Sequence, residues 1–210
     1  MMHKDKCAPL LEELQVSHLN LLKHHFDKLD VAAVHLRFGN NLSREARRAY
    51  VDRIPFARDA LFGVFADDLT LLGVAHLACL SGAAELGISV LASHQNKGVG
   101  SALFDRAAMH ASNLQIVELF MNCLAQNSAM MHIARKAGMR IVVENADADA
   151  YLELPPGTPF SVGQEFVEQE LARLDWTLKT NVDYLRQASK AARALTSRFR
   201  RQGSPNDPVK

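Results

Sequence analysis

Two glycines one residue apart mark the stretch of sequence whose residue types and spacing most suggest chemistry. The segment Gln95–Ser101 reads QNKGVGS, follows an apolar run and opens a stretch with helical spacing. Unpaired backbone N–H groups and the positive end of the helix dipole meet at a helix N-terminus, so such a corner can hold a phosphate. A plain tight turn is the alternative, because glycine is common between a strand and a helix.

The glycine loop does not match the two standard nucleotide-binding motifs. Counted from Gly98, both GxGxxG and the P-loop require a glycine at the position of Leu103, and the P-loop also requires a lysine at the position of Phe104. What the sequence does contain is a strand-like run, a short polar connection, Gly98, Gly100 and a helix-like run. A nucleotide-binding protein is therefore the weakest interpretation that we retain.

Composition and charge exclude several classes of protein. The 24 Lys and Arg residues balance 23 Asp and Glu residues, so no nucleic acid or anionic membrane is expected as a partner. Cys7, Cys79 and Cys123 are widely spaced and no metal-binding spacing is present, which favours no metal site, no disulfide framework and a reducing cytoplasm. No apolar run approaches the roughly 20 residues of a membrane span. We expect a soluble cytoplasmic protein.

The elements that must position the loop follow from hydrophobic periodicity and turn residues, and they indicate an α+β or mixed α/β sheet domain. Ser43 is expected to cap a helix that ends before Pro55. We expect helices over 9–35, as one or two segments, and over 43–54; antiparallel strands over 60–66, 69–80 and 84–91; a helix over 100–112, a strand over 117–123, a helix over 128–136, and strands over 141–144 and 148–154.

The C-terminal part of the chain has a different character. After LPPGTP at 154–159, apolar residues recur every three or four positions from 164 to 201, with acidic residues early and basic residues late. This pattern predicts one long helix that either mediates oligomerisation or docking, for example as a homodimer, or packs back on its own domain. We therefore divide the chain into a domain over 1–156, a helical extension over 157–203 and a flexible tail over 204–210.

Taken together, two motifs resemble the GNAT family of acyl-CoA-dependent N-acyltransferases. The first is the strand followed by Gln95-x-x-Gly98-x-Gly100 and a helix; the second is NSAMMHIARKAGM, with Asn127, Lys136 and Gly138 in the family's order. The resemblance covers about residues 10–154. HLRFGNNLS, AELGISVL and the second motif are similar, more narrowly, to the GNAT domains of bacterial protein-lysine acetyltransferases. The resemblance to the GNAT family implies a central, mostly antiparallel, splayed sheet flanked by helices, here with a C-terminal helical extension.

The resemblance also implies acetyl-CoA as cofactor and assigns residues to it. Asn127 would contact its arm, a role compatible with capping the helix that begins at Ser128. The assigned positions are Ile88, Val90 and Leu91, whose backbone groups would pair with the pantetheine, and Gln95, Asn96, Lys97, Gly98, Val99, Gly100 and Ser101, which would surround the pyrophosphate.

The chemistry implied by the resemblance is acetyl transfer to a primary amine of a small molecule or a protein lysine. Glu85 matches a position that can act as general base; an edge or ion-paired glutamate is the alternative. Many members place a tyrosine general acid where this chain has Ala134, and His132, Cys123 and Tyr151 are substitutes to consider, with no better claim for His76 and His94. The competing hypothesis is a non-catalytic acyl-CoA-binding regulatory or interaction module.

Overall fold

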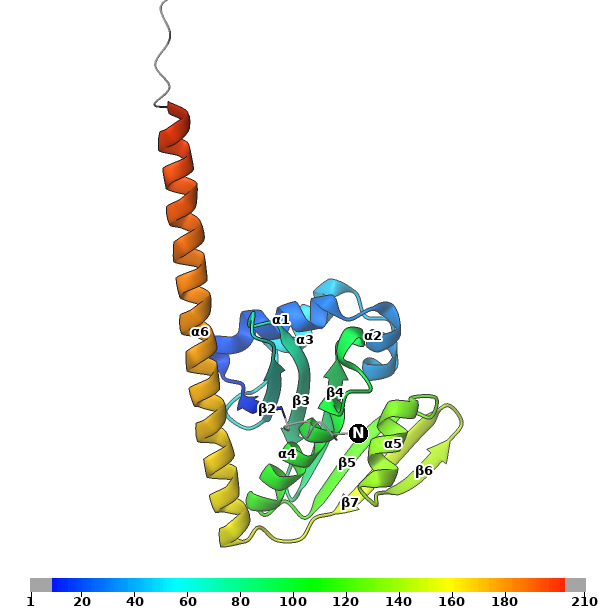
Figure 1. Cartoon of the computed structure of the whole chain (residues 1–210). Coiled ribbons are helices and arrows are strands. Elements are labelled where there is room, and N and C mark those ends of the chain that lie inside the picture. Colours follow the sequence, from blue (N-terminus) through cyan, green and yellow to red (C-terminus); the bar gives the residue numbers. More distant parts are fainter. Residues whose placement is uncertain (1–8, 203–210) are drawn as a thin grey trace, which may run out of the picture.

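A seven-stranded sheet with helices on both faces forms the body of the protein (Figure 1). The computed structural model describes residues 9–202. The strands follow one another across the sheet in the order β1-β2-β3-β4-β5-β7-β6, and only the β4–β5 pair is parallel. The strands are β1 (Leu11–Glu13), β2 (Ala60–Phe65), β3 (Leu71–Cys79), β4 (Ala83–Val90), β5 (Glu118–Leu124), β6 (Arg140–Glu144) and β7 (Asp147–Glu153).

The helices confirm most of the expected element order. Ser43 caps α3 by accepting a hydrogen bond from the Ala46 N–H (3.2 Å), and α5 occupies the predicted residues. The α+β class is confirmed, with a parallel β4–α4–β5 crossover after an antiparallel meander. The helices are α1 (Leu19–Lys28), α2 (Val31–Phe38), α3 (Arg44–Asp52), α4 (Val99–Asn113), α5 (Ser128–Lys136) and α6 (Pro159–Gln202).

The first strand corrects one prediction. The helical spacing of Leu11 and Leu14 suggested a helix from Pro9, whereas Leu11–Glu13 pairs antiparallel with Phe62–Val64. The Leu14 N–H then donates to the Leu61 carbonyl (2.8 Å), which prolongs the contact with the sheet. An edge of β2 that offers backbone hydrogen bonds outweighs a local helical pattern of only four residues, so the helical part begins later.

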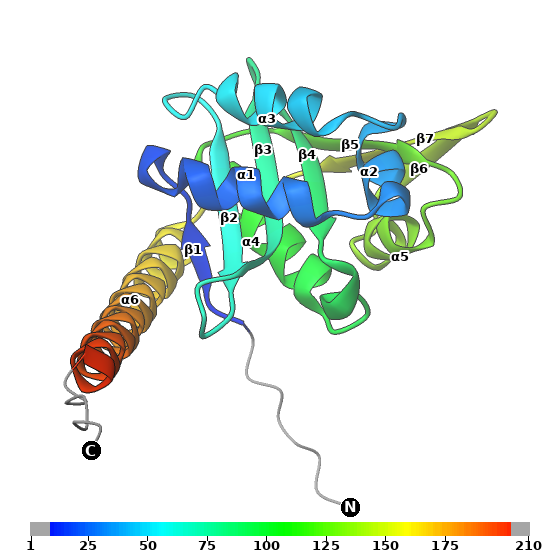
Figure 2. The ribbon, with the colours of Figure 1, turned by 90° about the horizontal axis from the view of Figure 1, so that it is seen from above.

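Two apolar cores lie on the two faces of the sheet. Phe62, Leu77 and Leu103 belong to the core under α4 and α5, and Phe26 and Leu61 belong to the core under α1, α2 and α3. Figure 2 shows α1 and α3 crossing one face of the sheet and α4 lying behind the other. Because successive strand residues point to opposite faces, each central strand contributes to both cores.

The sheet opens between its two parallel strands. Only Ala83–Glu85 of β4 pairs with Glu118–Phe120 of β5. Beyond these residues β4 continues to Val90 beside β3 alone, while β5 continues to Leu124 beside β7. The predicted splay is therefore present, and it leaves one backbone edge of β4 without a partner strand.

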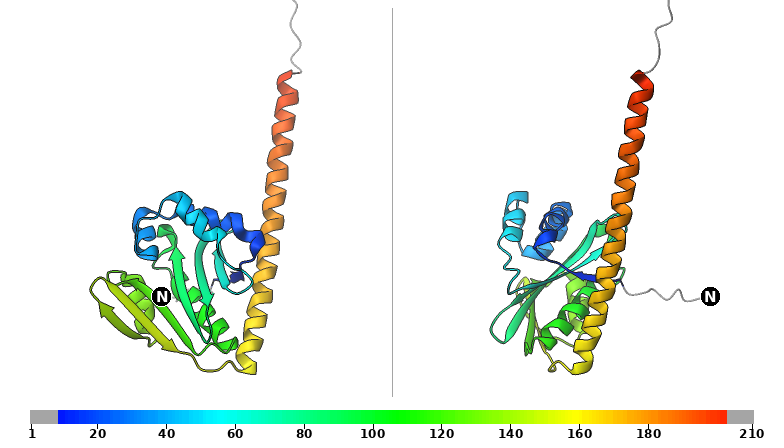
Figure 3. Two further views of the ribbon diagram at one scale, coloured as in Figure 1. Left: turned by 180° about the vertical axis from the view of Figure 1, so that it is seen from behind. Right: turned by 90° about the vertical axis from the view of Figure 1, so that its left-hand side faces the viewer.

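The terminal helix packs on the body through its first half and then extends away from it (Figures 1 and 3). Arg106, only 3% exposed, donates from Nη1 to Glu165 Oε1 (2.6 Å), and His110 and Asn113 also bind the Glu165 carboxylate. Burial alone would raise the pKa of Glu165, but these hydrogen bonds outweigh it and lower the pKa to about 2. Trp176 lies against Phe65, with 4.6 Å between ring centroids.

The predicted flexible tail over 204–210 lies outside the described residues. Within residues 9–202, every helix is too short or too polar to cross a bilayer.

Candidate functional site

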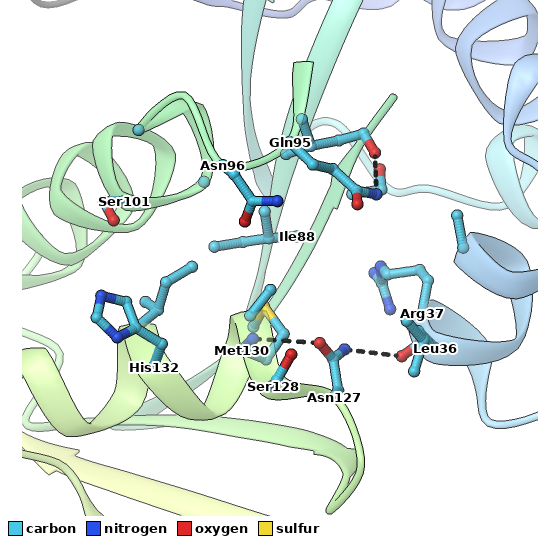
Figure 4. Close-up of a pocket in the computed structure, with 17 residues that line it drawn as sticks. Leu36, Arg37, Ile88, Gln95, Asn96, Ser101, Asn127, Ser128, Met130 and His132 are labelled. Carbon is cyan, nitrogen blue, oxygen red and sulfur yellow. Dashed lines mark hydrogen bonds between the residues drawn. The ribbon is translucent and has the colours of Figure 1, made fainter. Parts of the chain in front are cut away.

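A cavity of about 440 Å³ lies at the open end of the sheet, between β4, α4, α5 and α2. Figure 4 shows its wall, with Gln95 and Asn96 on one side and Asn127, Ser128 and His132 on another. Of the residues assigned to a cofactor from the sequence, those that line the cavity are Ile88, Val90, Gln95, Asn96, Gly98, Gly100, Ser101 and Asn127. Lys97 is exposed beside it, and Leu91 and Val99 are buried outside it.

The N-terminus of α4 faces this cavity with backbone donors. Gly98 is the residue before the helix, has a φ of 85° and provides no side-chain cap. The first intrahelical bond runs from the Ala102 N–H to the Gly98 carbonyl (3.0 Å), so the N–H groups over 99–101 precede the regular ladder. Asn96 also has a positive φ, 57°, which asparagine tolerates better than most residues. Unpaired N–H groups at a helix N-terminus can hold an anion, so this corner is a candidate anion-binding site.

The register of β4 decides which of its backbone groups face the opening. The Leu80 N–H donates to Ala83 O (2.8 Å) and the Leu91 N–H donates to Leu72 O (2.9 Å). Because alternate residues of an antiparallel strand bond to the same neighbour, odd-numbered residues of β4 face β3. Ile88 and Val90 consequently direct their N–H and C=O groups into the splay, whereas Leu91 does not.

Two amide side chains hold the walls of the cavity in place. Asn127 Oδ1 accepts a hydrogen bond from the Met130 N–H (3.2 Å), and its Nδ2 donates to the Leu36 carbonyl on α2 (3.4 Å; Figure 4). Asn127 is thus a helix cap and also a link across the opening. Gln95 Nε2 donates to the Val90 carbonyl (3.1 Å), which fixes the start of the glycine loop against β4.

A second cavity, of about 310 Å³, lies on the other side of Arg37. Arg37 contributes to the walls of both cavities. A Cβ at position 87 would overlap the Arg37 guanidinium, so the guanidinium lies directly over the backbone of Gly87. Its wall consists of Arg37, Tyr50, Arg53, Ile54, Pro55, Arg58, Asp59, His76, Ala78, Glu85 and Gly87. The predicted base, Glu85, therefore faces this cavity and not the first one.

Four side chains of the second cavity form a continuous hydrogen-bonded chain. Arg37 Nη2 donates to the Tyr50 hydroxyl (3.1 Å), Tyr50 Oη lies 2.6 Å from His76 Nδ1, and His76 Nε2 lies 3.0 Å from Asp59 Oδ2. Asp59 Oδ1 also accepts from Arg58 Nε (2.8 Å) and from the Cys79 N–H (3.2 Å). The buried carboxylate of Asp59 is therefore fully bonded.

Electrostatics define the protonation of this chain. Burial would raise the pKa of Asp59, but hydrogen bonds from Arg58 and His76 lower it overall, so Asp59 is ionised and accepts the His76 Nε2 proton. Burial lowers the pKa of His76 despite Asp59, and the neutral ring accepts the Tyr50 proton at Nδ1. Burial raises the pKa of Tyr50, which keeps the phenol protonated.

The substitutes considered for the absent tyrosine acid lie in different places. Ala134 is buried, His132 lines the first cavity, and Tyr151 of β7 stacks against Phe120 of β5. Burial raises the pKa of the Cys123 thiol, which makes its thiolate scarce.

Sequence reasoning gave His76 no special claim and missed Tyr50, Asp59 and Arg37. These residues come from α2, α3, β3 and the segment before β2, with no local motif. The only signal in the sequence was that these polar residues stand within or next to apolar runs that form a strand or a helix.

Comparison with known proteins agrees with this geometry. A family model described as "Acetyltransferase (GNAT) domain" matches residues 10–140, more than half of the chain. The chain therefore belongs to the GNAT acetyltransferase family. No curated protein sequence matches it significantly.

Solved structures with a similar fold share little sequence with this chain. The GNAT domain of S. lividans PAT has a TM-score of 0.59 at 18% identity, over 69% of this chain and 89% of that one. A ribosomal alpha-N-protein acetyltransferase, RimL, in complex with coenzyme A has a TM-score of 0.56 at 18% identity, over 70% and 97%. YncA of Salmonella typhimurium, a putative acetyltransferase with its cofactor acetyl-CoA, has a TM-score of 0.56 at 14% identity, over 72% and 97%.

Proposed function

We propose that this protein transfers an acetyl group from acetyl-CoA to a primary amine of a small molecule or a protein lysine. The observation that carries the proposal is the first cavity, where an unpaired edge of β4 and the uncapped N-terminus of α4 converge. Family membership and the two CoA-bound neighbours support the same cofactor.

The residues of the first cavity fit acetyl-CoA in type and order. Backbone groups of Ile88 and Val90 would hold the amide-containing arm, and the N–H groups over 98–101 would hold the pyrophosphate. Asn127 lines the same cavity, and its amide links the start of α5 to Leu36 of α2. When bound, the cofactor supplies an acyl group activated as a thioester. The chain's own residues supply its position and exclude water around it.

The second cavity would receive the amine. Glu85 faces it from β4 and has no ion-pair partner within residues 9–202. A free carboxylate there can bind the incoming ammonium and take its proton, which leaves the neutral amine that acyl transfer requires. Because Arg37 borders both cavities, the two substrates would meet beside it.

The test measures binding and transfer separately. In thermal-shift measurements on the full chain, acetyl-CoA should raise the unfolding temperature more than ATP or NAD, because a ligand specific for the folded state stabilises it. Incubation with a panel of amines and proteins should then release free thiol, and Glu85→Gln should slow the release by about 100-fold or more. Full transfer by Glu85→Gln would remove Glu85 from the mechanism. A shift with ATP or NAD alone would contradict the cofactor.

A non-catalytic acyl-CoA-binding module is the second candidate, and the alanine at position 134 favours it. The buried Ala134 offers no proton to a leaving thiolate from α5. This candidate predicts that acetyl-CoA stabilises the protein while no amine in the panel is acetylated.

We place the reaction in the cytoplasm. Cys79 and Cys123 are both free thiols, as proteins of a reducing compartment usually have. Cys7 lies outside the described residues.

A further inference from the structure

The hydrogen-bonded chain of the second cavity has a direction. Asp59 is ionised, so His76 carries its proton on Nε2 and receives the Tyr50 proton at Nδ1 (2.6 Å). The Tyr50 oxygen is left with a lone pair and accepts one bond from Arg37 (3.1 Å). A proton that arrives at this oxygen can therefore be matched by the Tyr50 proton moving to His76, where the Asp59 carboxylate stabilises the imidazolium.

The start of this chain lies where the two cavities approach each other. Tyr50 lines the second cavity with Glu85, and Arg37, its hydrogen-bond partner, also lines the first cavity. His76 pairs with Gly87 and Ala78 pairs with Glu85 across β3 and β4, so His76 and Glu85 share one face of the sheet. Tyr50 is partly buried and lines the second cavity at the end of the Asp59–His76 pair, so the hydrogen-bonded chain begins at the cavity wall.

From this geometry we propose that Tyr50, His76 and Asp59 form a proton relay that removes the second proton of the acceptor amine; the inference rests on the proposed acetyl transfer. Glu85 takes the first proton when the ammonium enters. As the N–C bond to the acyl carbon forms, the N–H proton passes to Tyr50 Oη and the Tyr50 proton passes to His76 Nδ1. When the C–S bond breaks, its electron pair leaves with the sulfur, and His76 returns the proton to it through Tyr50.

The charged groups around the relay come from several elements. Arg37 approaches from α2, Asp59 and Arg58 lie before β2, and Glu85 faces it from β4. The relay requires neutral His76, so transfer should decline as the pH falls through the pKa of His76, which burial lowers from its usual 6.5. Asp59→Asn should leave the geometry largely intact, but the neutral amide would stabilise the protonated His76 ring less than the carboxylate does.

The test combines activity with a spectroscopic measurement on the full chain. We expect Tyr50→Phe to lower kcat for acetyl transfer about 100-fold or more, with little change in the KM for acetyl-CoA, and to abolish the His76-dependent acidic limb. The matched control is Tyr151→Phe on β7, a tyrosine that lines neither cavity and should keep wild-type kinetics. In ¹⁵N NMR spectra of the wild type, His76 should carry its proton on Nε2.

The outcomes separate this relay from the proposed function. If the wild type acetylates amines and Tyr50→Phe keeps both its rate and its pH profile, the relay is wrong and the proposed function stands. An Nδ1–H tautomer of His76 would also overturn the relay, whether or not transfer occurs. If the wild type acetylates nothing, the proposed function fails and the relay fails with it.

A second inference concerns the exposed face of α6 and rests on different observations. Helix α6 has 44 residues and so extends about 66 Å at about 1.5 Å per residue. At about 100° per residue, seven apolar residues fall in one narrow stripe, opposite the face that carries Glu165 and Trp176. They are 44% to 80% exposed: Phe160, Val167, Leu171, Leu174, Leu178, Val182 and Leu185.

Charge along α6 is strongly divided. The half over 159–180 has four acidic and two basic residues, a net charge of −2, while the half over 181–202 has one acidic and six basic residues, a net charge of +5. Two copies aligned in parallel would bring the two +5 halves together. An antiparallel alignment would place each basic half beside an acidic one.

The spacing of the apolar residues in the stripe is symmetric about Leu178, as an antiparallel pair of helices requires. Leu178 is midway between Leu171 and Leu185 and also midway between Leu174 and Val182. We infer that two copies of this chain associate through antiparallel α6 helices centred on Leu178. The same register places Glu168 of each copy on the same flank and at nearly the same height as Arg186 of the other. The docked half of α6 would then hold the projecting half of its partner.

Disulfide crosslinking tests the orientation, in a background with Cys7→Ser, Cys79→Ser and Cys123→Ser. Leu178→Cys should crosslink with itself, and a mixture of Leu171→Cys and Leu185→Cys chains should crosslink with each other. Leu171→Cys alone should not, because antiparallel pairing separates the two copies of residue 171. Efficient crosslinking of Leu171→Cys alone would establish a parallel pair and overturn the inference.

Sedimentation of the full chain tests the association itself. Dimers are expected at tens of micromolar, with Arg186→Glu weakening them and Glu168→Arg combined with Arg186→Glu restoring part of the loss. These side chains are on the surface, so unchanged acetyl-CoA binding would confirm folding. A monomer at all concentrations would reject the pair.

Discussion

The two cavities that share Arg37 are lined by different kinds of chemical groups. The first is formed by a backbone edge of β4, the N–H groups of a helix N-terminus and small or amide side chains. The second is formed by charged and titratable side chains from α2, α3, β3, β4 and the segment before β2. A site made of backbone groups depends on one local motif, whereas a site made of side chains depends on how distant segments pack. The same fold can therefore keep one cavity and vary the other.

The largest effect is expected from acid, which should damage both cavities together through the strand they share. Ser89 of β4 is hydrogen-bonded to the buried His25 Nε2 (2.8 Å), and burial lowers the pKa of His25 to about 4. The folded state therefore favours neutral His25: its contribution is complete above pH 6.5 and is lost as the pH falls from 6.5 to about 4. The free energy of unfolding should fall by about 3 kcal/mol over this range.

Chemical denaturation at several pH values measures this loss. His25→Gln should flatten the slope between pH 6.5 and 4. His24→Gln, an exposed neighbour on the same helix, is the control and should keep it. An unchanged slope in His25→Gln would show that acid acts elsewhere.

Gly87→Ala should impair the second cavity and spare the first. The new Cβ would overlap the Arg37 guanidinium and displace it from Tyr50. Loss of a charged hydrogen bond costs about 1.5–3 kcal/mol, so transfer should fall about 10- to 100-fold while acetyl-CoA affinity changes little. Kinetics and calorimetry together separate the two quantities. The control is Gly163→Ala on α6, where a Cβ meets no atom within 4 Å. Equal losses of affinity and rate would mean that the cavities are not separable.

Gly98→Val should impair the first cavity and spare the second. Gly98 has a φ of 85°, a conformation that costs a branched residue about 1–2 kcal/mol and that sets the direction of the α4 N–H groups. Acetyl-CoA should bind about tenfold more weakly, and the NMR signals of His76 should not move. A change at His76 would show that the glycine loop and the relay are coupled. Titration calorimetry gives the affinity.

Glu165→Gln should affect neither cavity, and so has the smallest effect on transfer. The pKa of Glu165 is lowered to about 2, so its stabilising contribution is complete above pH 4.5 and is lost as the pH falls from 4.5 to about 2. At pH 7 the variant should lose about 1–2 kcal/mol of stability by leaving Arg106 without its charged partner. Thermal unfolding measures the loss; a large fall in transfer would mean that α6 supports the site.

The predictable parts of the fold were those with strong local signals. Strands over 60–91 and the helices near residues 44, 100 and 128 were predicted to within one or two residues, because turn residues and caps such as Ser43 and Asn127 mark their ends. The three-residue strand β1 was missed because it depends on pairing with residues of β2 that lie 49 to 53 positions away in sequence. Short elements carry too little local information to resist such pairing.

The sequence alone determined the glycine loop at Gly98 and Gly100 before the N-terminus of α4. Unpaired N–H groups at the start of a helix depend only on residues that are neighbours in sequence, here two glycines and a helix-forming run. A splayed sheet was expected from the resemblance, but only the tertiary structure decided that β4 and β5 part after Glu85. It also decided that Tyr50, His76 and Asp59 form one chain beside Arg37. The physical reason is range: hydrogen bonds between side chains form within about 3 Å in space and leave no spacing in a sequence whose partners lie on separate elements.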